Sequence, residues 1–244
     1  MPLNSDNTSD STEPDAPEPA THEPGADAHD PIGEFWDQRY AGLETLWSGQ
    51  PNAALVSEAR ALVPGRALDV GCGEGADALW LAAQGWDVTA LDVSRVALDR
   101  AARAELALAS EPETAGGAAG HGVKPVRWLH AALVEAALPP ATFDLVSAQY
   151  PALLRTPDNV AEHALLDAVA PGGVLLIVHH PAPTAEEATR HGFDADLYVS
   201  PANVRALLGD AWLIEVDETR PRHVAAGAGA HHTEDVVVRA RRVR

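Results

Sequence analysis

The sequence predicts an α/β protein built on a doubly wound, mostly parallel sheet. From about residue 32 onward, short apolar segments typical of buried strands alternate with helical segments, which is the pattern of a parallel sheet covered by helices on both faces. The last two strand segments follow one another without a helix between them. We therefore expect them to form an antiparallel hairpin at one edge of the sheet.

Each element follows from local signals along the chain. Ser94 is expected to cap the start of a helix, and Gly85 and the run 171–173 (Pro-Gly-Gly) are expected to end two others. Strands are expected at residues 66–70, 86–91, 125–130, 143–148, 174–179, 212–218 and 235–240. Helices are expected at residues 33–42, 52–62, 76–84, 94–109, 159–170 and 201–208.

Two segments have the composition of disordered chain. Residues 1–31 hold eight of the 36 acidic residues, no Lys or Arg, and almost nothing large and apolar, so they cannot bury enough surface to fold. We expect a disordered acidic tail at 1–31 and a single folded domain at 32–244. The Gly- and Ala-rich stretch 110–124 is expected to be a flexible surface insertion.

The charge and cysteine content exclude several classes of protein. With 36 acidic against 17 basic residues, the net charge is −19, which argues against binding to nucleic acid or to an anionic membrane surface. The single cysteine, Cys72, rules out an intramolecular disulfide and fits a reducing, cytoplasmic location. No apolar run reaches the length of about 18 residues that spans a bilayer, and no secretory signal is expected at the amino terminus.

A glycine-rich turn after the first strand is the most informative segment. Residues 67–77 (ALDVGCGEGAD) place three glycines at alternate positions just before a helix, where backbone N–H groups can face a ligand. Asp92 ends the next strand, where a carboxylate can accept hydrogen bonds from ribose hydroxyls. The spacing Gly71-x-Gly73-x-x-Ala76 also fits a loose dinucleotide pattern, so an NAD-dependent oxidoreductase is an alternative. A structural turn without a ligand is a third reading.

Four motifs in this order resemble those of class I S-adenosylmethionine-dependent methyltransferases: LDVGCGEG, TALDVS, FDLVSAQY and PGGVLLIV. The resemblance implies a Rossmann-like seven-stranded sheet whose last strand inserts antiparallel. It also implies S-adenosylmethionine as cofactor, and methyl transfer to a small-molecule acceptor at sulfur, nitrogen, oxygen or a heavier chalcogen. A non-catalytic module that only binds adenosylmethionine is the remaining alternative.

The same resemblance implies roles for individual residues. Asp92 would hold the ribose hydroxyls, with Val93 against the adenine and Gln149 near the sulfonium. The methionine part would lie against Asp69, Gly71, Gly73 and Gly75. The sequence departs from the family after the third strand, where residues 130–133 (His-Ala-Ala-Leu) lack the Asp that often bonds the adenine amino group. If Ala132 takes that place, the adenine contact falls to backbone groups or is lost.

The segments FWDQRY and LWSGQPN near the start of the predicted domain resemble the subgroup that includes thiopurine and tellurite-resistance methyltransferases. In that subgroup the first helix folds over the cofactor. The resemblance therefore places Trp36, Arg39, Tyr40 and Trp47 on a lid, where an aromatic face would stabilise the sulfonium. Alternatively, Trp36 anchors the helix to the core.

Histidines are numerous and cluster in two places. His179 and His180 follow the fifth strand, and we expect one of them to position or deprotonate the acceptor. Neighbouring strand residues point to opposite faces, so at most one should enter the pocket; a loop histidine without a chemical role is the alternative. His223, His231 and His232 flank an Ala/Gly loop that we expect to be a mobile cover over the substrate entrance. No metal site is expected, because these histidines lack zinc-ligand spacing.

Overall fold

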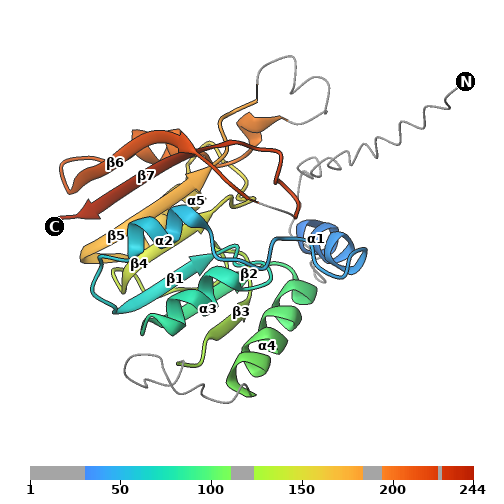
Figure 1. The fold of residues 1–244 in the computed structure, drawn as a ribbon. Coiled ribbons are helices and arrows are strands. Elements are labelled where there is room, and N and C mark those ends of the chain that lie inside the picture. The colour runs from blue at the N-terminus through green and yellow to red at the C-terminus, as the bar shows by residue number, and fades with distance from the viewer. Residues whose placement is uncertain (1–30, 111–123, 184–193, 225–226) are drawn as a thin grey trace, which may run out of the picture.

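The structure, a computed structural model, describes residues 31–110, 124–183, 194–224 and 227–244. The predicted acidic tail lies outside the described residues except for Pro31, and so does nearly all of the predicted insertion at 110–124. The first helix, α1 (Pro31–Ala41), begins at the last residue of the predicted tail. The fold below therefore concerns the predicted domain (Figure 1).

The sheet has seven strands in the order β3-β2-β1-β4-β5-β7-β6. Only β7 runs against its neighbours: it pairs antiparallel with β5 and with β6, while the other pairs are parallel. The strands are β1 (Arg66–Val70), β2 (Asp87–Asp92), β3 (Arg127–His130), β4 (Phe143–Gln149), β5 (Val169–His179), β6 (Trp212–Pro221) and β7 (Glu234–Arg242). This arrangement confirms the predicted fold class, including the antiparallel terminal hairpin.

Helices cover both faces of the sheet, as Figure 1 shows. Apolar residues of α2, α3 and α4 pack in one buried cluster with one face. Apolar residues of α5 and α7 pack in a second cluster on the other face. These helices are α2 (Ala53–Ala59), α3 (Ala76–Ala83), α4 (Arg95–Ser110), α5 (Val160–Ala168) and α7 (Pro201–Ala206). Because both faces are covered, β1, β4 and β5 are apolar along most of their length.

The boundary between α5 and β5 differs from the prediction. The sequence predicts a helix to residue 170 and a strand from 174, but the helix ends at Ala168 and β5 starts at Val169. Val169 pairs with Phe143, and the register then shifts so that Val174 pairs with Leu145. The Pro-Gly-Gly run is therefore an irregularity inside the strand, because pairing with β4 overrides the local stop signal. A short 3-10 helix, η1 (Ala195–Leu197), was not predicted.

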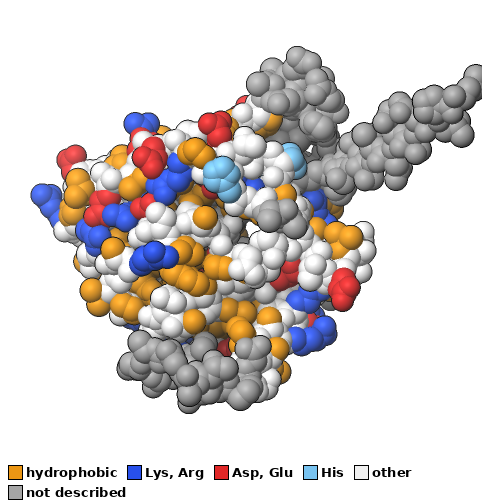
Figure 2. All heavy atoms as spheres, viewed as in Figure 1, with side chains coloured by type: hydrophobic (Ala, Val, Ile, Leu, Met, Phe, Trp, Pro, Cys, Tyr) orange, Lys and Arg blue, Asp and Glu red, His pale blue; other side chains and the backbone are white. Residues whose placement is uncertain are grey.

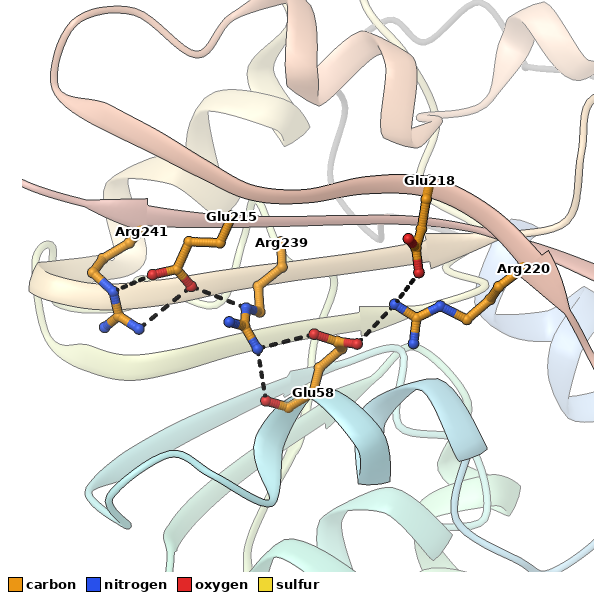
Figure 3. A network of polar contacts seen from close by, with 6 residues as sticks. All are labelled: Glu58, Glu215, Glu218, Arg220, Arg239 and Arg241. Carbon is orange, nitrogen blue, oxygen red and sulfur yellow. Dashed lines mark hydrogen bonds and ion pairs between the residues drawn. The ribbon is translucent and has the colours of Figure 1, made fainter.

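A network of ion pairs docks α2 onto the terminal hairpin (Figure 3). The buried carboxylate of Glu58 on α2 accepts from Arg220 of β6 at 2.7 Å and from Arg239 of β7 at 2.9 Å. On the hairpin itself, Glu215 pairs with both Arg239 and Arg241. These contacts hold the first part of the domain against its last two strands.

The carboxyl ends of the parallel strands lie together at one side of the sheet, called its carboxyl edge below, and α1 lies at that side (Figure 1). On the face shown in Figure 2, basic and acidic side chains are interspersed over the hairpin side rather than gathered into a patch of one sign. Among the described residues, no helix is long and apolar enough to cross a membrane. The carboxyl edge is where doubly wound folds bind ligands.

Candidate functional site

The predicted glycine turn is present, and its three alternate glycines all have left-handed backbone. Gly71, Gly73 and Gly75 have φ of 70°, 52° and 84°, which residues with a Cβ rarely adopt. A Cβ at Gly73 would lie 2.9 Å from the Tyr40 hydroxyl, and one at Gly75 would lie 2.7 Å from the Trp128 ring. Glycine is therefore required both by the conformation of the turn and by its close neighbours.

Asp92 closes the turn from the neighbouring strand. Its Oδ2 accepts a hydrogen bond from the Gly73 N–H and its Oδ1 accepts one from the Ser94 N–H, both at 2.8 Å. Burial raises the pKa of Asp92, and the two N–H donors oppose that rise. The predicted ribose carboxylate is thus fixed against the turn, with lone pairs still available because each oxygen has two.

Two further carboxylates, Asp69 and Asp77, are buried beside Asp92. Asp77 accepts from the Asn52 N–H and from its side-chain amide, both at 2.7 Å. In contrast, Oδ2 of Asp69 has no hydrogen-bond partner among the described residues. Burial raises the pKa of Asp69 well above its usual range, and the charges of Asp77 and Asp92 raise it further. The charges of Asp77 and Asp92 repel that of Asp69, so a cation beside Asp69 would stabilise this group.

Gln149 supplies a second unused acceptor at the carboxyl edge of the sheet. Its amide nitrogen donates to the Ser147 hydroxyl at 3.1 Å, whereas its Oε1 has no partner among the described residues. Ser147 is paired with Asp69 across β1 and β4, so Gln149 lies two residues further along the adjacent strand. Two buried oxygens without donors therefore lie near the turn.

The segment from α1 to residue 48 covers the turn. Trp47 donates its indole N–H to the Tyr40 hydroxyl at 2.8 Å, and both lie within van der Waals reach of Gly73. Trp36 packs in an apolar cluster with Tyr40, and the Arg39 guanidinium lies 5.4 Å from the Trp36 ring. Tyr40 and Trp47 thus meet the turn, whereas Trp36 packs between the lid and Ala97 of α4.

Glu74, inside the turn, binds this cover directly. Its carboxylate accepts from the Leu46 and Trp47 N–H groups and from Arg100 at 2.8 Å. Arg100 in turn donates to the backbone carbonyls of Tyr40 and Leu43. The sequence offered no signal for this contact, because Arg100 lies 60 residues from Tyr40 and pairs with it only once the chain is folded.

Val93 and His130 define the far end of the site. The His130 Nε2 lies 2.9 Å from the Val93 carbonyl, which can only accept, so Nε2 carries the proton. Nδ1 then accepts from Arg95 at 3.1 Å. The carbonyl of Ala132, within the segment where the family's Asp is missing, accepts from the N–H groups of Glu135 and Ala136. No side-chain acceptor from residues 130–133 is therefore free at this position.

Beyond β4, a polar cluster surrounds Tyr150. This residue has φ of 51°, a strained value for a bulky side chain, and its hydroxyl donates to Asp235 at 2.7 Å. Arg222 donates to the same hydroxyl at 3.1 Å and lies 3.5 Å from the Asp235 carboxylate. Burial raises the pKa of both Tyr150 and Asp235.

Both predicted catalytic histidines lie beside Tyr150. The His180 ring stacks on Tyr150 at 4.4 Å and on His232 at 3.7 Å, while the His179 ring lies 6.3 Å from Tyr150. The expectation that at most one of them enters the acceptor pocket stays a prediction. The strand ends at His179, so the alternation of faces does not extend to His180. Burial lowers the pKa of both, that of His180 to about 2.

The remaining histidines and the cysteine behave as follows. His231 lies 4.1 Å from His232 and continues the ring column, whereas His223 is exposed. Within the described ranges, no group of three potential ligands can hold a metal ion. Burial raises the pKa of the Cys72 thiol, which therefore stays protonated and is a poor nucleophile.

The connection between β6 and β7 reaches the cover over the turn. The Ala228 N–H donates to the Leu46 carbonyl at 2.9 Å. Gly227, with φ of 96°, lies so close to Trp47 that a Cβ there would come within 2.8 Å of the Trp47 backbone. The described part of the predicted entrance loop thus packs on residues 46–48, and two distant segments together cover the site.

Both the family model and the curated relatives that this chain matches are described as methyltransferases. Residues 67–173 match the family model described as a methyltransferase domain. Uncharacterized methyltransferases of Mycobacterium tuberculosis and Mycobacterium bovis are 36% identical over 125 residues, which are 51% of this chain and 55% of each relative. The chain thus spans about half the length of the curated relatives that it matches.

Two solved structures show the same fold. One, from a study of the conversion of a disulfide bond into a thioacetal group during echinomycin biosynthesis, has a TM-score of 0.64 and 24% identity, covering 86% of this chain and 92% of that one. The other, magnesium protoporphyrin IX methyltransferase from Synechocystis with bound S-adenosylhomocysteine, has a TM-score of 0.53 and 19% identity, covering 85% and 83%.

Proposed function

We propose that this chain is an S-adenosylmethionine-dependent methyltransferase that acts on a small-molecule acceptor. The observation that carries the proposal is the group of three buried carboxylates, Asp69, Asp77 and Asp92, around a left-handed glycine turn. S-adenosylmethionine carries a sulfonium and an ammonium group, and a cation relieves the repulsion among these carboxylates. The matched methyltransferase domain, residues 67–173, contains all three.

The residues present fit the parts of this cofactor. Asp69 keeps a buried oxygen without a donor, which suits the ammonium group, and Gln149 keeps one that can face the sulfonium. Asp92, held by Gly73 and Ser94, takes the ribose hydroxyls. When bound, the cofactor supplies a methyl group activated for transfer by the positive sulfur. The other contacts in this assignment are Gly71, Gly75, Val93, Trp36, Arg39 and Trp47.

The same charges disfavour the oxidoreductase alternative. A nicotinamide dinucleotide would place its doubly negative pyrophosphate at the start of α3, beside the glycine turn. Asp77 lies in the first turn of α3, and Asp69 lies just before the glycines. The negative charges of these two carboxylates would repel the pyrophosphate and oppose its binding. The geometry therefore favours a positively charged cofactor over a dinucleotide.

The acceptor would bind at the carboxyl ends of β4 and β5, next to Tyr150. Methyl transfer is an in-line displacement, so holding the acceptor in line with the methyl and sulfur in a dry site supplies much of the rate. One of His179 and His180 positions or deprotonates the acceptor. Burial lowers the pKa of both imidazoles, so both are neutral at pH 7 and a ring nitrogen can accept a hydrogen bond from the acceptor. The lowered pKa also makes each imidazole a weak base, which favours the positioning role over deprotonation.

The finer assignments rest on the sequence motifs. The contact of Tyr40 with Trp47 over the turn supports membership of the thiopurine and tellurite-resistance subgroup. The acceptor atom in this proposal is sulfur, nitrogen, oxygen or a heavier chalcogen. A cytoplasmic location stays a prediction.

Calorimetric titration tests the cofactor. We expect binding of S-adenosylmethionine and S-adenosylhomocysteine and none of NAD; the reverse result would overturn the proposal. A methyl-acceptor screen with sulfur, nitrogen, oxygen and selenium nucleophiles then separates an enzyme from a module that only binds the cofactor. Loss of turnover in either His179→Ala or His180→Ala, with cofactor affinity retained, is the expected outcome for the acceptor residue.

A further inference from the structure

Asp37, in the middle of α1, reaches across to the start of another helix. Its Oδ1 accepts from the Ser94 hydroxyl at 2.6 Å and from the Val96 N–H at 3.0 Å. These groups belong to the first turn of α4, whose N–H groups lack partners within the helix. Ser94 is the predicted N-cap of α4, and its hydroxyl also accepts from the Ala97 N–H at 3.1 Å. A side chain from α1 therefore completes the cap of α4.

This contact continues to the glycine turn. The Ser94 residue that donates its hydroxyl to Asp37 donates its backbone N–H to Asp92. Asp92 accepts from the Gly73 N–H with its other oxygen. A series of hydrogen bonds of 2.6 to 2.8 Å thus joins α1 to the turn through Ser94 and Asp92. Ser94 therefore contributes both to the placement of α1 and to that of the Asp92 carboxylate.

The other end of α1 is held separately. Arg100 binds the carbonyls of Tyr40 and Leu43, and Glu74 binds the N–H groups of Leu46 and Trp47. The carboxyl-terminal end of the lid is therefore fixed without Asp37. In the first two turns, residues 31–38, Asp37 supplies hydrogen bonds that tie the helix to the start of α4.

From these contacts we propose that Asp37 is a positioning residue for cofactor binding: it holds the first turns of α1 on α4 and, through Ser94, fixes the Asp92 carboxylate against the glycine turn. The inference rests on the proposed function for its ligand. Its structural part, the docking of residues 31–38, is independent of that function.

The test uses the full chain and three variants. Asp37→Ala removes both hydrogen bonds that Asp37 accepts, whereas Asp37→Asn keeps an acceptor oxygen in place. Asp99→Asn is the control, because it changes an exposed carboxylate on α4, the helix to which Asp37 binds. Two quantities are measured: S-adenosylhomocysteine affinity by calorimetry and hydrogen exchange of residues 31–38 and 44–48 by mass spectrometry.

We expect Asp37→Ala to weaken S-adenosylhomocysteine affinity about tenfold, the effect of losing one or two hydrogen bonds. Exchange should speed up in residues 31–38 and stay unchanged in 44–48. Asp37→Asn should recover most of the affinity, and Asp99→Asn should match the wild type. A merely structural role would speed up exchange in residues 31–38 without weakening the affinity for S-adenosylhomocysteine.

Wild-type affinity in Asp37→Ala overturns the proposal, and so does an Asn variant as weak as the Ala variant. If the wild type itself fails to bind S-adenosylhomocysteine, the proposed function fails instead. The exchange of residues 31–38 then decides the docking role alone: faster exchange in Asp37→Ala supports it, and unchanged exchange contradicts it.

Discussion

The hydroxyl of Tyr150 donates a 2.7 Å hydrogen bond to the carboxylate of Asp235. The bond joins the residue that follows β4 to the second residue of β7, two strands away in the sheet. Because Tyr150 directly follows Gln149, the terminal hairpin helps to fix the carboxyl edge of the sheet, at which we place the acceptor.

Removing this hydroxyl should destabilise the domain. Tyr150→Phe leaves the buried Asp235 with one donor fewer, and we expect a loss of about 1 to 3 kcal/mol in the free energy of unfolding. Asp235→Asn should cost more, because the buried Arg222 then loses its counter-charge. Urea unfolding measures both, with the exposed Asp210→Asn as control; a variant of Tyr150 as stable as the wild type would contradict the expectation.

The histidine column should make stability depend on acid pH. His180 has a pKa of about 2 in the folded state because of burial, against about 6.5 for an unfolded chain. Below pH 6.5 this imidazole binds a proton in the unfolded chain but not in the folded domain. The free energy of unfolding is therefore fully retained above pH 6.5 and falls as the pH drops below that value, by up to about 1.4 kcal/mol per pH unit. Buried carboxylates whose pKa is raised in the folded state make the unfolding free energy rise as the pH falls. The effect of His180 is therefore measured as the difference between the wild type and a variant that lacks this imidazole.

The comparison is between wild type and His180→Phe, which keeps a stacking ring that cannot bind a proton. We expect the unfolding free energy of the wild type to fall more steeply than that of the variant between pH 6.5 and 5. The exposed His163→Phe should follow the wild type. Parallel pH curves for all three proteins would show that His180 is not held neutral.

Gly73 should not tolerate alanine. Its φ of 52° strains any residue with a Cβ, and the new methyl group would press on Tyr40 and Trp47. Gly172→Ala is the matched control, since its φ is 82° but nothing lies within 4 Å of the added Cβ. Both variants should lose about 1 kcal/mol from backbone strain. Only Gly73→Ala should also lose S-adenosylhomocysteine affinity, measured by calorimetry.

Asp69 should trade stability against binding. Asp69→Asn removes one of three repelling carboxylates, so we expect an unfolding free energy at pH 8 higher by about 1 kcal/mol, and affinity for S-adenosylmethionine lower by at least about tenfold. Asp77→Asn should instead destabilise, because Asp77 binds Asn52. Unchanged affinity in the Asp69 variant would argue against an ammonium group at this position.

The ion pairs that dock α2 should be unequal in strength. Glu58→Gln leaves two arginines facing a neutral buried side chain, and we expect a loss of about 2 kcal/mol. Glu218→Gln, which removes a half-exposed partner of Arg220, should change stability by less than about 0.5 kcal/mol. Thermal unfolding of the two variants ranks them, and equal losses would refute the assigned role of burial.

Much of the fold follows from local patterns. The alternation of apolar strands with helices gave every strand of the sheet, and the absence of a helix between the last two strands gave the antiparallel pair. The predicted start of β5 at residue 174 was wrong: the strand starts at Val169, because pairing with Phe143 outweighed the Pro-Gly-Gly signal. Partner strands lie far away in sequence, so a local pattern cannot register that competition.

The candidate site divides in the same way. The three glycines and Asp92 were predicted from their places in a turn and at a strand end, whereas Asp69 was predicted only through the resemblance of LDVGCGEG to a methyltransferase motif. Asp37, Glu74 and Arg100 were missed. Nothing in their local sequence distinguishes them from surface charges, since each gains its role from a partner 26 to 60 residues away.

By itself, then, the sequence determined the α/β fold and the glycine turn, because these depend on side-chain periodicity and on the steric freedom of glycine, and it placed Asp92 at the strand end beside that turn. Only the tertiary structure decided which charges are buried together, which histidines stack, and which segments cover the turn. Those relationships are set by how α1, the carboxyl edge of the sheet and the terminal hairpin pack, and the desolvation that packing imposes gives the carboxylates and imidazoles their chemistry.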